Sequence, residues 1–80
     1  MKIIELYSPT CMPCKILDKR IQDIIKDHPE VEYNHLNALE HPEYNVQGTP
    51  HLIIEKDGTE IYNSHVTNIV EAINLIKDNL

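Results

Sequence analysis

The two cysteines of this chain, Cys11 and Cys14, are separated by two residues and stand between a short apolar run and a helix-like pattern. A disulfide between them would close a loop of four residues. Loop-closure entropy gives such a bond about 2 kcal/mol before strain is subtracted. A disulfide placed to stabilise a small domain would span more sequence. The pair therefore points to redox catalysis, to metal binding, or to an accident of sequence.

Length and charge limit what such a chain can do. Its 80 residues suffice for one small domain, residues 1–80, in which roughly 63% of the surface is buried. The formal net charge of −6 repels nucleic acid and anionic membranes, so neither is expected as a partner. The apolar runs are too short for a membrane span or a signal peptide. We expect a cytoplasmic monomer.

The first predicted unit is a strand, a tight turn and an amphipathic helix. Residues 2–7 carry apolar side chains on both faces, which is typical of a central strand. Pro13 suits the first turn of a helix, where its missing N–H costs nothing. The helix should end near His28, before Pro29. Its apolar positions are Ile16, Leu17, Ile21, Ile24 and Ile25, and its predicted solvent face carries Asp18, Lys19, Gln22, Asp23 and Lys26.

The rest of the chain completes a mixed sheet. The predicted elements are a strand over 31–36, a hairpin with strands over 51–56 and 59–63, and a helix over 68–79 with the stripe Ile69, Ile73, Ile76 and Leu80. Residues 37–47 should form turns, with one or two helical turns at most. A helix between two strands implies a right-handed crossover and parallel strands. The order βαβ, turns, ββα predicts an α/β fold with a four-stranded mixed sheet and two long helices on one face.

A Cys-x-x-Cys that opens a helix after the first strand, in a chain of this element order, resembles the thioredoxin and glutaredoxin superfamily. A second motif supports the resemblance, because the run from Val46 to Pro50 enters the third strand where that superfamily places a cis-proline facing the dithiol. The resemblance covers nearly the whole chain. It implies a thioredoxin-like fold and a protein-disulfide reductase that serves electron transport and cell redox homeostasis.

The chemistry of the motif also follows from its position. Cys11 at a helix N-terminus meets unpaired N–H groups and the positive end of the helix dipole, which favour thiolate. Cys14, one turn later on the same face, can then resolve the mixed disulfide. We expect Thr49 and Pro50 to bind an extended substrate segment through the Thr49 backbone. Met12 and Pro13 between the cysteines look closer to the Gly-Pro of thioredoxins than to the Pro-Tyr of glutaredoxins.

Glu5 stands where thioredoxins carry a buried acid behind the dithiol. It lies between Ile3 and Tyr7 on one face of the predicted central strand, so desolvation should raise its pKa. Such a group can take the proton of Cys14 during resolution. Tyr33 stands about where thioredoxins have a lysine. The alternative is a carboxylate that reaches solvent at the sheet edge.

The expected partners follow from what the chain lacks. Residues 63–68 do not show the Gly-Gly and acidic pair that glutathione-binding glutaredoxins carry. A thioredoxin reductase-type electron donor is therefore expected rather than glutathione. Disulfide-containing proteins are the expected substrates, with ribonucleotide reductase suggested by analogy. No cofactor is expected.

Other interpretations remain open. A zinc site would use both cysteines with His35 and His41, although the gap between the pairs is longer than usual. An iron–sulfur cluster bridging two chains, and a non-catalytic interaction module of the same fold, are the others. We expect His28, His35, His41 and His65 at the surface, and His51, beside Pro50, is a candidate for tuning the thiolate.

Overall fold

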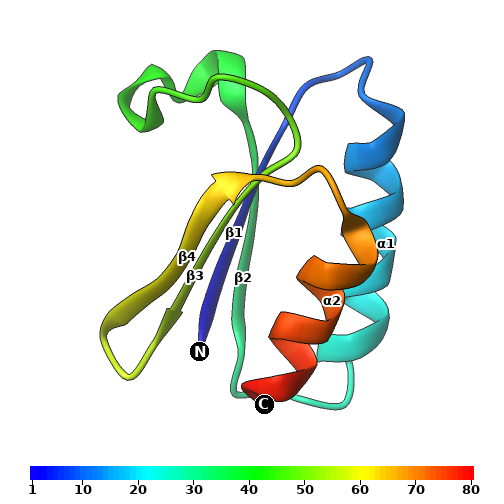
Figure 1. The fold of residues 1–80 in the computed structure, drawn as a ribbon, viewed down its shortest axis with the longest axis vertical. Coiled ribbons are helices and arrows are strands. Elements are labelled where there is room, and N and C mark those ends of the chain that lie inside the picture. The colour runs from blue at the N-terminus through cyan, green and yellow to red at the C-terminus, as the bar shows by residue number, and fades with distance from the viewer.

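The computed structural model describes all 80 residues as a four-stranded sheet with both long helices on one face (Figure 1). The elements are β1 Lys2–Tyr7, α1 Met12–Ile25, β2 Glu32–Asn37, the 3-10 helices η1 Ala38–Glu40 and η2 Pro42–Tyr44, β3 His51–Lys56, β4 Thr59–His65 and α2 Ile69–Asp78. The strand order is β2-β1-β3-β4. Strand β2 runs parallel to β1, and β3 is antiparallel to β1 and β4. The predicted α/β fold is confirmed.

Strand β1 is central, as its two apolar faces predict. Ile3 belongs to the core under the helices, whereas Ile4 and Leu6 belong to a smaller core on the opposite face. The helix-side core also contains Leu17, Ile21, Leu52, Ile54, Val66, Ala72, Ile73 and Ile76. A large-to-small change at one of these sites costs about 2–5 kcal/mol. The alternation along β1 therefore places every second residue, Glu5 included, beneath the helices.

The face of the sheet opposite the two long helices is covered by residues 37–47, for which the sequence predicts no long helix. Residues 37–47 contain two single-turn 3-10 helices, as predicted. The apolar side chains of this stretch that the sequence offers as cover are Leu39, Tyr44 and Val46. Tyr44 and Val46 do pack on the smaller core, together with Leu36 and Ala38, whereas Leu39 is 78% exposed. Two short helical segments cannot turn every apolar side chain inward, so this face is thinly covered.

The predicted boundaries shift by a few residues. Helix α1 ends at Ile25 rather than near His28, and β4 extends to His65 because its pairing with β3 continues to His51. Ile16 and Leu80, expected on buried stripes, are 47% and 43% exposed. Ile16 lies in the first half of α1, whereas Leu80 follows the end of α2 at Asp78 and so lies outside that helix.

Helix α2 begins as the sequence predicts. The side chain of Asn68 accepts a hydrogen bond from the Glu71 N–H at 3.1 Å, which satisfies one of the unpaired donors of the first turn. Neither α1 nor α2 has the length and apolarity needed to cross a membrane. Both chain termini lie at the end of the sheet opposite to the start of α1 (Figure 1). The region around the two cysteines is therefore clear of the termini.

Candidate active site

The two cysteines form a disulfide at the start of α1. Cys11 is the N-cap residue, with extended backbone angles, and its Sγ accepts the N–H of Cys14 at 3.2 Å. Cys14 is 1% exposed, whereas Cys11 is partly exposed. Pro13 lies in the first turn, as expected from its missing N–H. Only Cys11 therefore presents its sulfur to a partner, and that sulfur lies where a helix stabilises negative charge.

The segment that enters β3 lies beside the cysteine loop. The Thr49–Pro50 peptide bond is cis, and Pro50 is buried. The hydroxyl oxygens of Ser8 and Thr49 are 3.1 Å apart. Pro13 and Pro50 line one open groove of about 540 Å³. The fold thus brings the Cys11–Cys14 motif and the Val46–Pro50 motif together, although their first residues are 35 positions apart.

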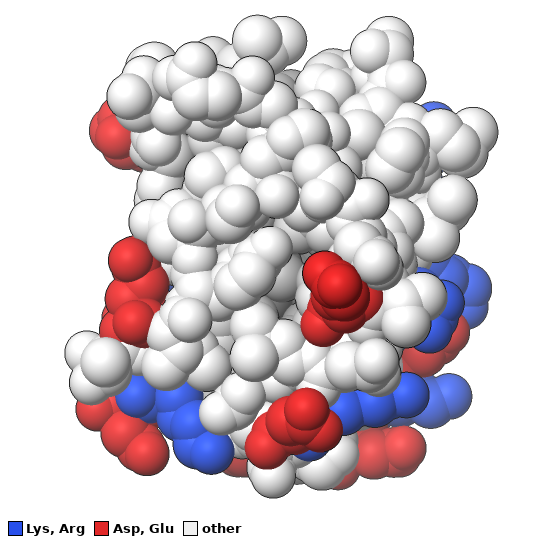
Figure 2. All heavy atoms as spheres, in the orientation of Figure 1, with Lys and Arg blue, Asp and Glu red and all other residues white.

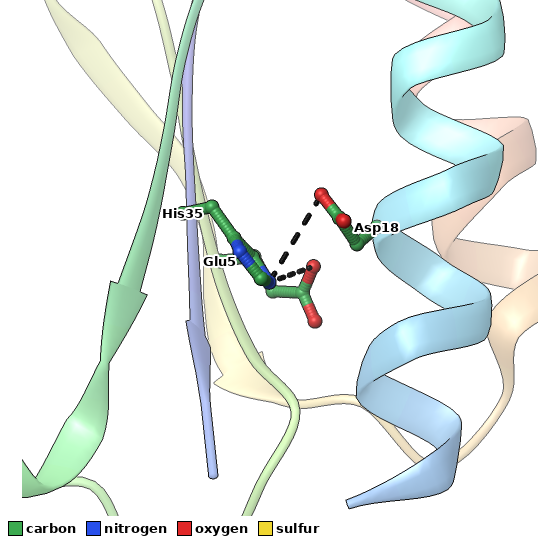
Figure 3. A group of neighbouring side chains, drawn as sticks. All are labelled: Glu5, Asp18 and His35. Carbon is green, nitrogen blue, oxygen red and sulfur yellow. Dashed lines mark ion pairs between the residues drawn. The ribbon is translucent and has the colours of Figure 1, made fainter. Parts of the chain in front are cut away.

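Glu5 is fully buried on the face of β1 that turns toward α1 (Figure 3). Its Oε1 accepts a hydrogen bond from the Tyr33 hydroxyl at 3.1 Å, and the same hydroxyl lies 2.6 Å from Oδ1 of Asp18. Nε2 of His35 is 3.6 Å from Oε1 of Glu5 and 4.0 Å from Oδ1 of Asp18 (Figure 3). Burial, reinforced by the charge of Asp18 and partly offset by the Tyr33 hydrogen bond, raises the pKa of Glu5 to about 8. Glu5 is therefore mostly protonated at neutral pH.

Residues 1–78 match the family model described as Thioredoxin. The chain belongs to the thioredoxin family. It is similar to thioredoxin 1 of Thermosipho africanus, with 29% identity and a TM-score of 0.78, over 98% of this chain and 92% of that one. It is also similar to oxidised mitochondrial thioredoxin 3 of Saccharomyces cerevisiae, with 27% identity and a TM-score of 0.79, over 96% of this chain and 76% of that one. Thioredoxin O2 of Arabidopsis thaliana shares the fold alone, at 16% identity, a TM-score of 0.80, and coverage of 96% of this chain and 72% of that one.

Membership of the thioredoxin family, together with the Cys11–Cys14 disulfide, supports a thiol–disulfide oxidoreductase. The predicted resemblance and the thioredoxin-like fold are confirmed. The structure also places Glu5 as the sequence predicts, buried on the helix side of β1 rather than reaching solvent at a sheet edge.

Two members of the Glu5 group were missed by the sequence pattern. Asp18 was expected on the solvent face of α1, but it is only 20% exposed and accepts the Tyr33 hydroxyl. His35 lies at the surface, as predicted, with 34% of its side chain exposed, yet its ring nitrogen faces Glu5. Tyr33 and His35 are two residues apart on β2, so strand alternation puts them on one face. The two-residue spacing of Tyr33 and His35 indicates that they share a face of β2. It does not indicate that this face is the one on which Glu5 lies.

The predicted zinc ligands do not come together as one set. His35 pairs with Glu5 and Asp18, whereas Nδ1 of His41 lies 3.0 Å from Oε2 of Glu43. Donor atoms of Glu5, Asp18 and His35 lie within 4.8 Å of one another. Tyr33 already lies within hydrogen-bond distance of Oε1 of Glu5 and Oδ1 of Asp18, so one oxygen of each carboxyl is engaged within the chain.

The remaining predicted site residues divide between the groove and the sheet. Met12 is 61% exposed beside Cys11, and Pro13 and Thr49 line the groove. Nε2 of His51 instead lies 2.6 Å from Oδ1 of Asn63 on β4. This ring nitrogen of His51 is thus held by the neighbouring strand, and a part for His51 in tuning the thiolate stays a prediction.

Proposed function

We propose that this protein reduces disulfides in other proteins through the Cys11–Cys14 dithiol. The observation that carries the proposal is the unequal placement of the two sulfurs. Cys11 is partly exposed and is the N-cap residue of α1, whereas Cys14, one turn into the helix, is buried. One sulfur is thus suited to attack a large substrate, and the other can reach only Cys11.

The reaction takes two exchange steps. The Cys11 thiolate attacks one substrate sulfur, forms a mixed disulfide and releases the other substrate sulfur as a thiolate, which takes a proton from water. An ionised Glu5, the minor form at neutral pH, then takes the proton of Cys14, which attacks Cys11 and displaces the second substrate sulfur as a thiolate that water protonates. The substrate disulfide gains two electrons and two protons, and the enzyme ends as the Cys11–Cys14 disulfide seen here.

The surroundings of Cys11 favour reduction over oxidation of substrates. Proteins that oxidise others strongly do so because their reduced form is stabilised. In this structure one backbone N–H, that of Cys14, donates to the Cys11 sulfur, and no lysine, arginine or histidine side chain hydrogen-bonds to it. The lack of a cationic side chain bonded to this sulfur is the basis on which we propose a reductase rather than a strong oxidant.

The surface around Cys11 suits protein substrates. Figure 2 shows that charged side chains gather toward the end of the molecule that holds the termini, and that the opposite end is largely uncharged. Three apolar side chains near the cysteine loop and the Thr49–Pro50 segment are exposed: Met12 next to Cys11 at 61%, Leu39 at 78% and Val70 at 58%. The Thr49 N–H makes no hydrogen bond within the chain, so it is free to pair with an extended substrate backbone. Apolar contact and backbone pairing make few demands on substrate sequence.

The expected donor and targets belong to this proposal. A thioredoxin reductase-type enzyme would return electrons to the disulfide, since the glutathione-binding residues of glutaredoxins are missing. One similar structure, at 26% identity, a TM-score of 0.78 and coverage of 96% of this chain and 76% of that one, concerns the resolving of a yeast mitochondrial 1-Cys peroxiredoxin through glutathione and thioredoxin systems. Ribonucleotide reductase, suggested by analogy, is another disulfide-bearing target, and we propose a cytoplasmic monomer.

The test is reduction of insulin disulfides, followed by the turbidity of the precipitated chains. One arm supplies a bacterial thioredoxin reductase with NADPH, and the other supplies glutathione with glutathione reductase. We expect turnover in the first arm and little in the second. Absence of insulin reduction even when dithiothreitol keeps the protein reduced would contradict the proposed function.

A further inference from the structure

The ring of His65 lies against the backbone segment that leads into Pro50. His65 is the last residue of β4 and is paired with His51, the first residue of β3. Its Nε2 lies 3.3 Å from the carbonyl oxygen of Thr49. The same ring lines the groove that Pro13 and Pro50 share. A side chain from β4 thus reaches the backbone to which we assign substrate binding.

Gly48 leaves the space in which this ring lies. A Cβ atom at Gly48 would stand 3.1 Å from Cε1, 3.2 Å from Nδ1 and 3.3 Å from Nε2 of His65. Such distances are shorter than ordinary van der Waals contact, so a side chain at position 48 would push the ring away. Gly48 is not among the residues with positive φ, so the turn itself does not require a glycine here. The absence of a Cβ at Gly48 therefore serves the contact with His65.

The two backbone groups of Thr49 are unequally occupied. A carbonyl oxygen can only accept a hydrogen bond, so the hydrogen in the His65 contact belongs to Nε2. The Thr49 N–H, by contrast, has no acceptor within the chain. In an antiparallel pairing of two extended segments, a residue of each exchanges both of its backbone hydrogen bonds with its partner. Thr49 offers its donor freely, whereas a side chain of the protein already donates to its acceptor.

We propose that His65 determines substrate specificity by taking the place of the substrate's backbone N–H at the Thr49 carbonyl. The site then requires a hydrogen-bond acceptor from the substrate but no donor. Because a carbonyl oxygen has two lone pairs, a substrate N–H is accepted as well, although binding does not depend on it. The substrates so admitted are disulfides whose flanking N–H is already bonded within the substrate's own fold. This role rests on the proposed function, since it describes how the same site selects its substrates.

The groove contains few other donors for this carbonyl. Pro13 and Pro50 have no N–H, and the Val66 N–H already donates to the Pro50 carbonyl at 2.8 Å. Water can reach Thr49 while the groove is open, but a bound substrate segment excludes it. An acceptor left unpaired in this way costs more than the hydrogen bond itself contributes. The His65 ring removes that cost for a substrate that brings no N–H.

The test measures how fast the reduced protein opens a disulfide between two identical short peptides, with no reductase present. In a series of these peptides, one backbone N–H near the cysteine at a time is replaced by an ester oxygen, which removes the donor and adds no bulk. Replacing the N–H that faces Thr49 should lower the second-order rate constant of the wild-type protein less than about two-fold. In His65→Phe, which keeps a ring without a donor, the same replacement should lower it roughly ten-fold.

Two variants and one further peptide are the controls. His65→Gln carries an amide N–H that can reach the same carbonyl, so it should tolerate the ester as the wild type does. His28→Phe makes the matched substitution beyond the end of α1, away from the groove, and should also behave as the wild type. An ester one residue further along weakens the substrate carbonyl that pairs with the Thr49 N–H. That peptide should react more slowly with all four proteins alike.

Three kinetic results would overturn the proposal. They are a roughly ten-fold ester penalty already present in the wild type, no added penalty in His65→Phe, and a penalty in His65→Gln as large as that in His65→Phe. The last result would make ring shape, rather than the donor, responsible.

The ring tautomer gives a reading that needs no activity. Long-range proton–nitrogen NMR of the neutral ring should find the hydrogen on Nε2 of His65. A hydrogen on Nδ1 would overturn the proposal whatever the rates. The Nε2–H form, together with failure of the wild-type protein to open any peptide disulfide, would overturn the proposed function while the His65–Thr49 contact stands.

Discussion

The hydroxyl oxygens of Ser8 and Thr49, residues 41 positions apart, lie 3.1 Å from each other. This contact joins the loop that carries the cysteines to the segment that ends at Pro50. The same segment is also held from β4 and the residue after it, since Nε2 of His65 lies 3.3 Å from the Thr49 carbonyl oxygen and the Val66 N–H donates to the Pro50 carbonyl at 2.8 Å. The Ser8–Thr49 pair is thus the side-chain contact that ties this segment to the loop before α1.

We expect Ser8→Ala and Thr49→Val each to lower the free energy of unfolding by about 1 kcal/mol. Because the two changes remove the same hydrogen bond, the double variant should lose less than the two single losses combined. Urea denaturation monitored by circular dichroism measures all three. Thr59→Val, at an exposed position on β4, is the control and should change stability by no more than about 0.5 kcal/mol. Additive losses would show that the hydroxyls do not interact.

The two cysteines should behave differently when replaced. Cys11→Ser should abolish disulfide reduction, because Cys14 is buried and cannot reach a substrate. Cys14→Ser should stop at the mixed disulfide, visible as a covalent complex on non-reducing gels. In the reduced protein, iodoacetamide should modify Cys11 well before Cys14 at pH 7. Equal rates of modification at the two sulfurs would contradict the assigned order.

Glu5 should make stability fall as pH rises. Its folded pKa of about 8 lies above the ordinary 4.5, so its contribution is complete below pH 4.5 and is lost between pH 4.5 and 8. By pH 7 the loss amounts to about 3 kcal/mol. Glu5→Gln cannot ionise, so its stability relative to wild type should increase over this range while its exchange rate falls.

Urea denaturation at pH 5, 7 and 8.5 checks the Glu5 prediction. Glu40→Gln, at an exposed position on η1, is the control and should show no such divergence from wild type. A constant difference between Glu5→Gln and wild type across these pH values would mean that the buried carboxyl is not destabilised by ionisation.

Residues 38–45 should exchange their amide hydrogens quickly. Their 3-10 turns hold three backbone hydrogen bonds, donated by His41, Tyr44 and Asn45, and Leu39 contributes little packing. Segments with few buried contacts open without global unfolding. Hydrogen exchange followed by NMR should give much lower protection here than in β1. Protection equal to that of β1 would show that η1 and η2 belong to the main cooperative unit.

The sequence by itself determined the elements and the reactive pair. Alternation in β1, the helical spacing after Pro13 and the Asp57-Gly58 turn are local signals, and each corresponds to an element of the structure. The position of Cys11 at a helix start, and hence its reactivity, follows from the same signals. Glu5 could be foreseen as buried because both faces of β1 are apolar, and a residue on such a strand has no route to solvent.

The tertiary structure alone decided what surrounds Glu5. The register that sets His35 beside Glu5, and the rotation of α1 that turns Asp18 inward, depend on how separate elements pack. In a helical pattern Asp18 lies beside the apolar positions of α1. A rotation of α1 about its axis by a few tens of degrees would move this side chain from water to the sheet. Pairing across 28 residues, as between Tyr33 and Glu5, leaves no trace in local periodicity. The surroundings of the buried carboxyl are therefore decided by packing, whereas the cysteine pair at the helix start is readable in the sequence.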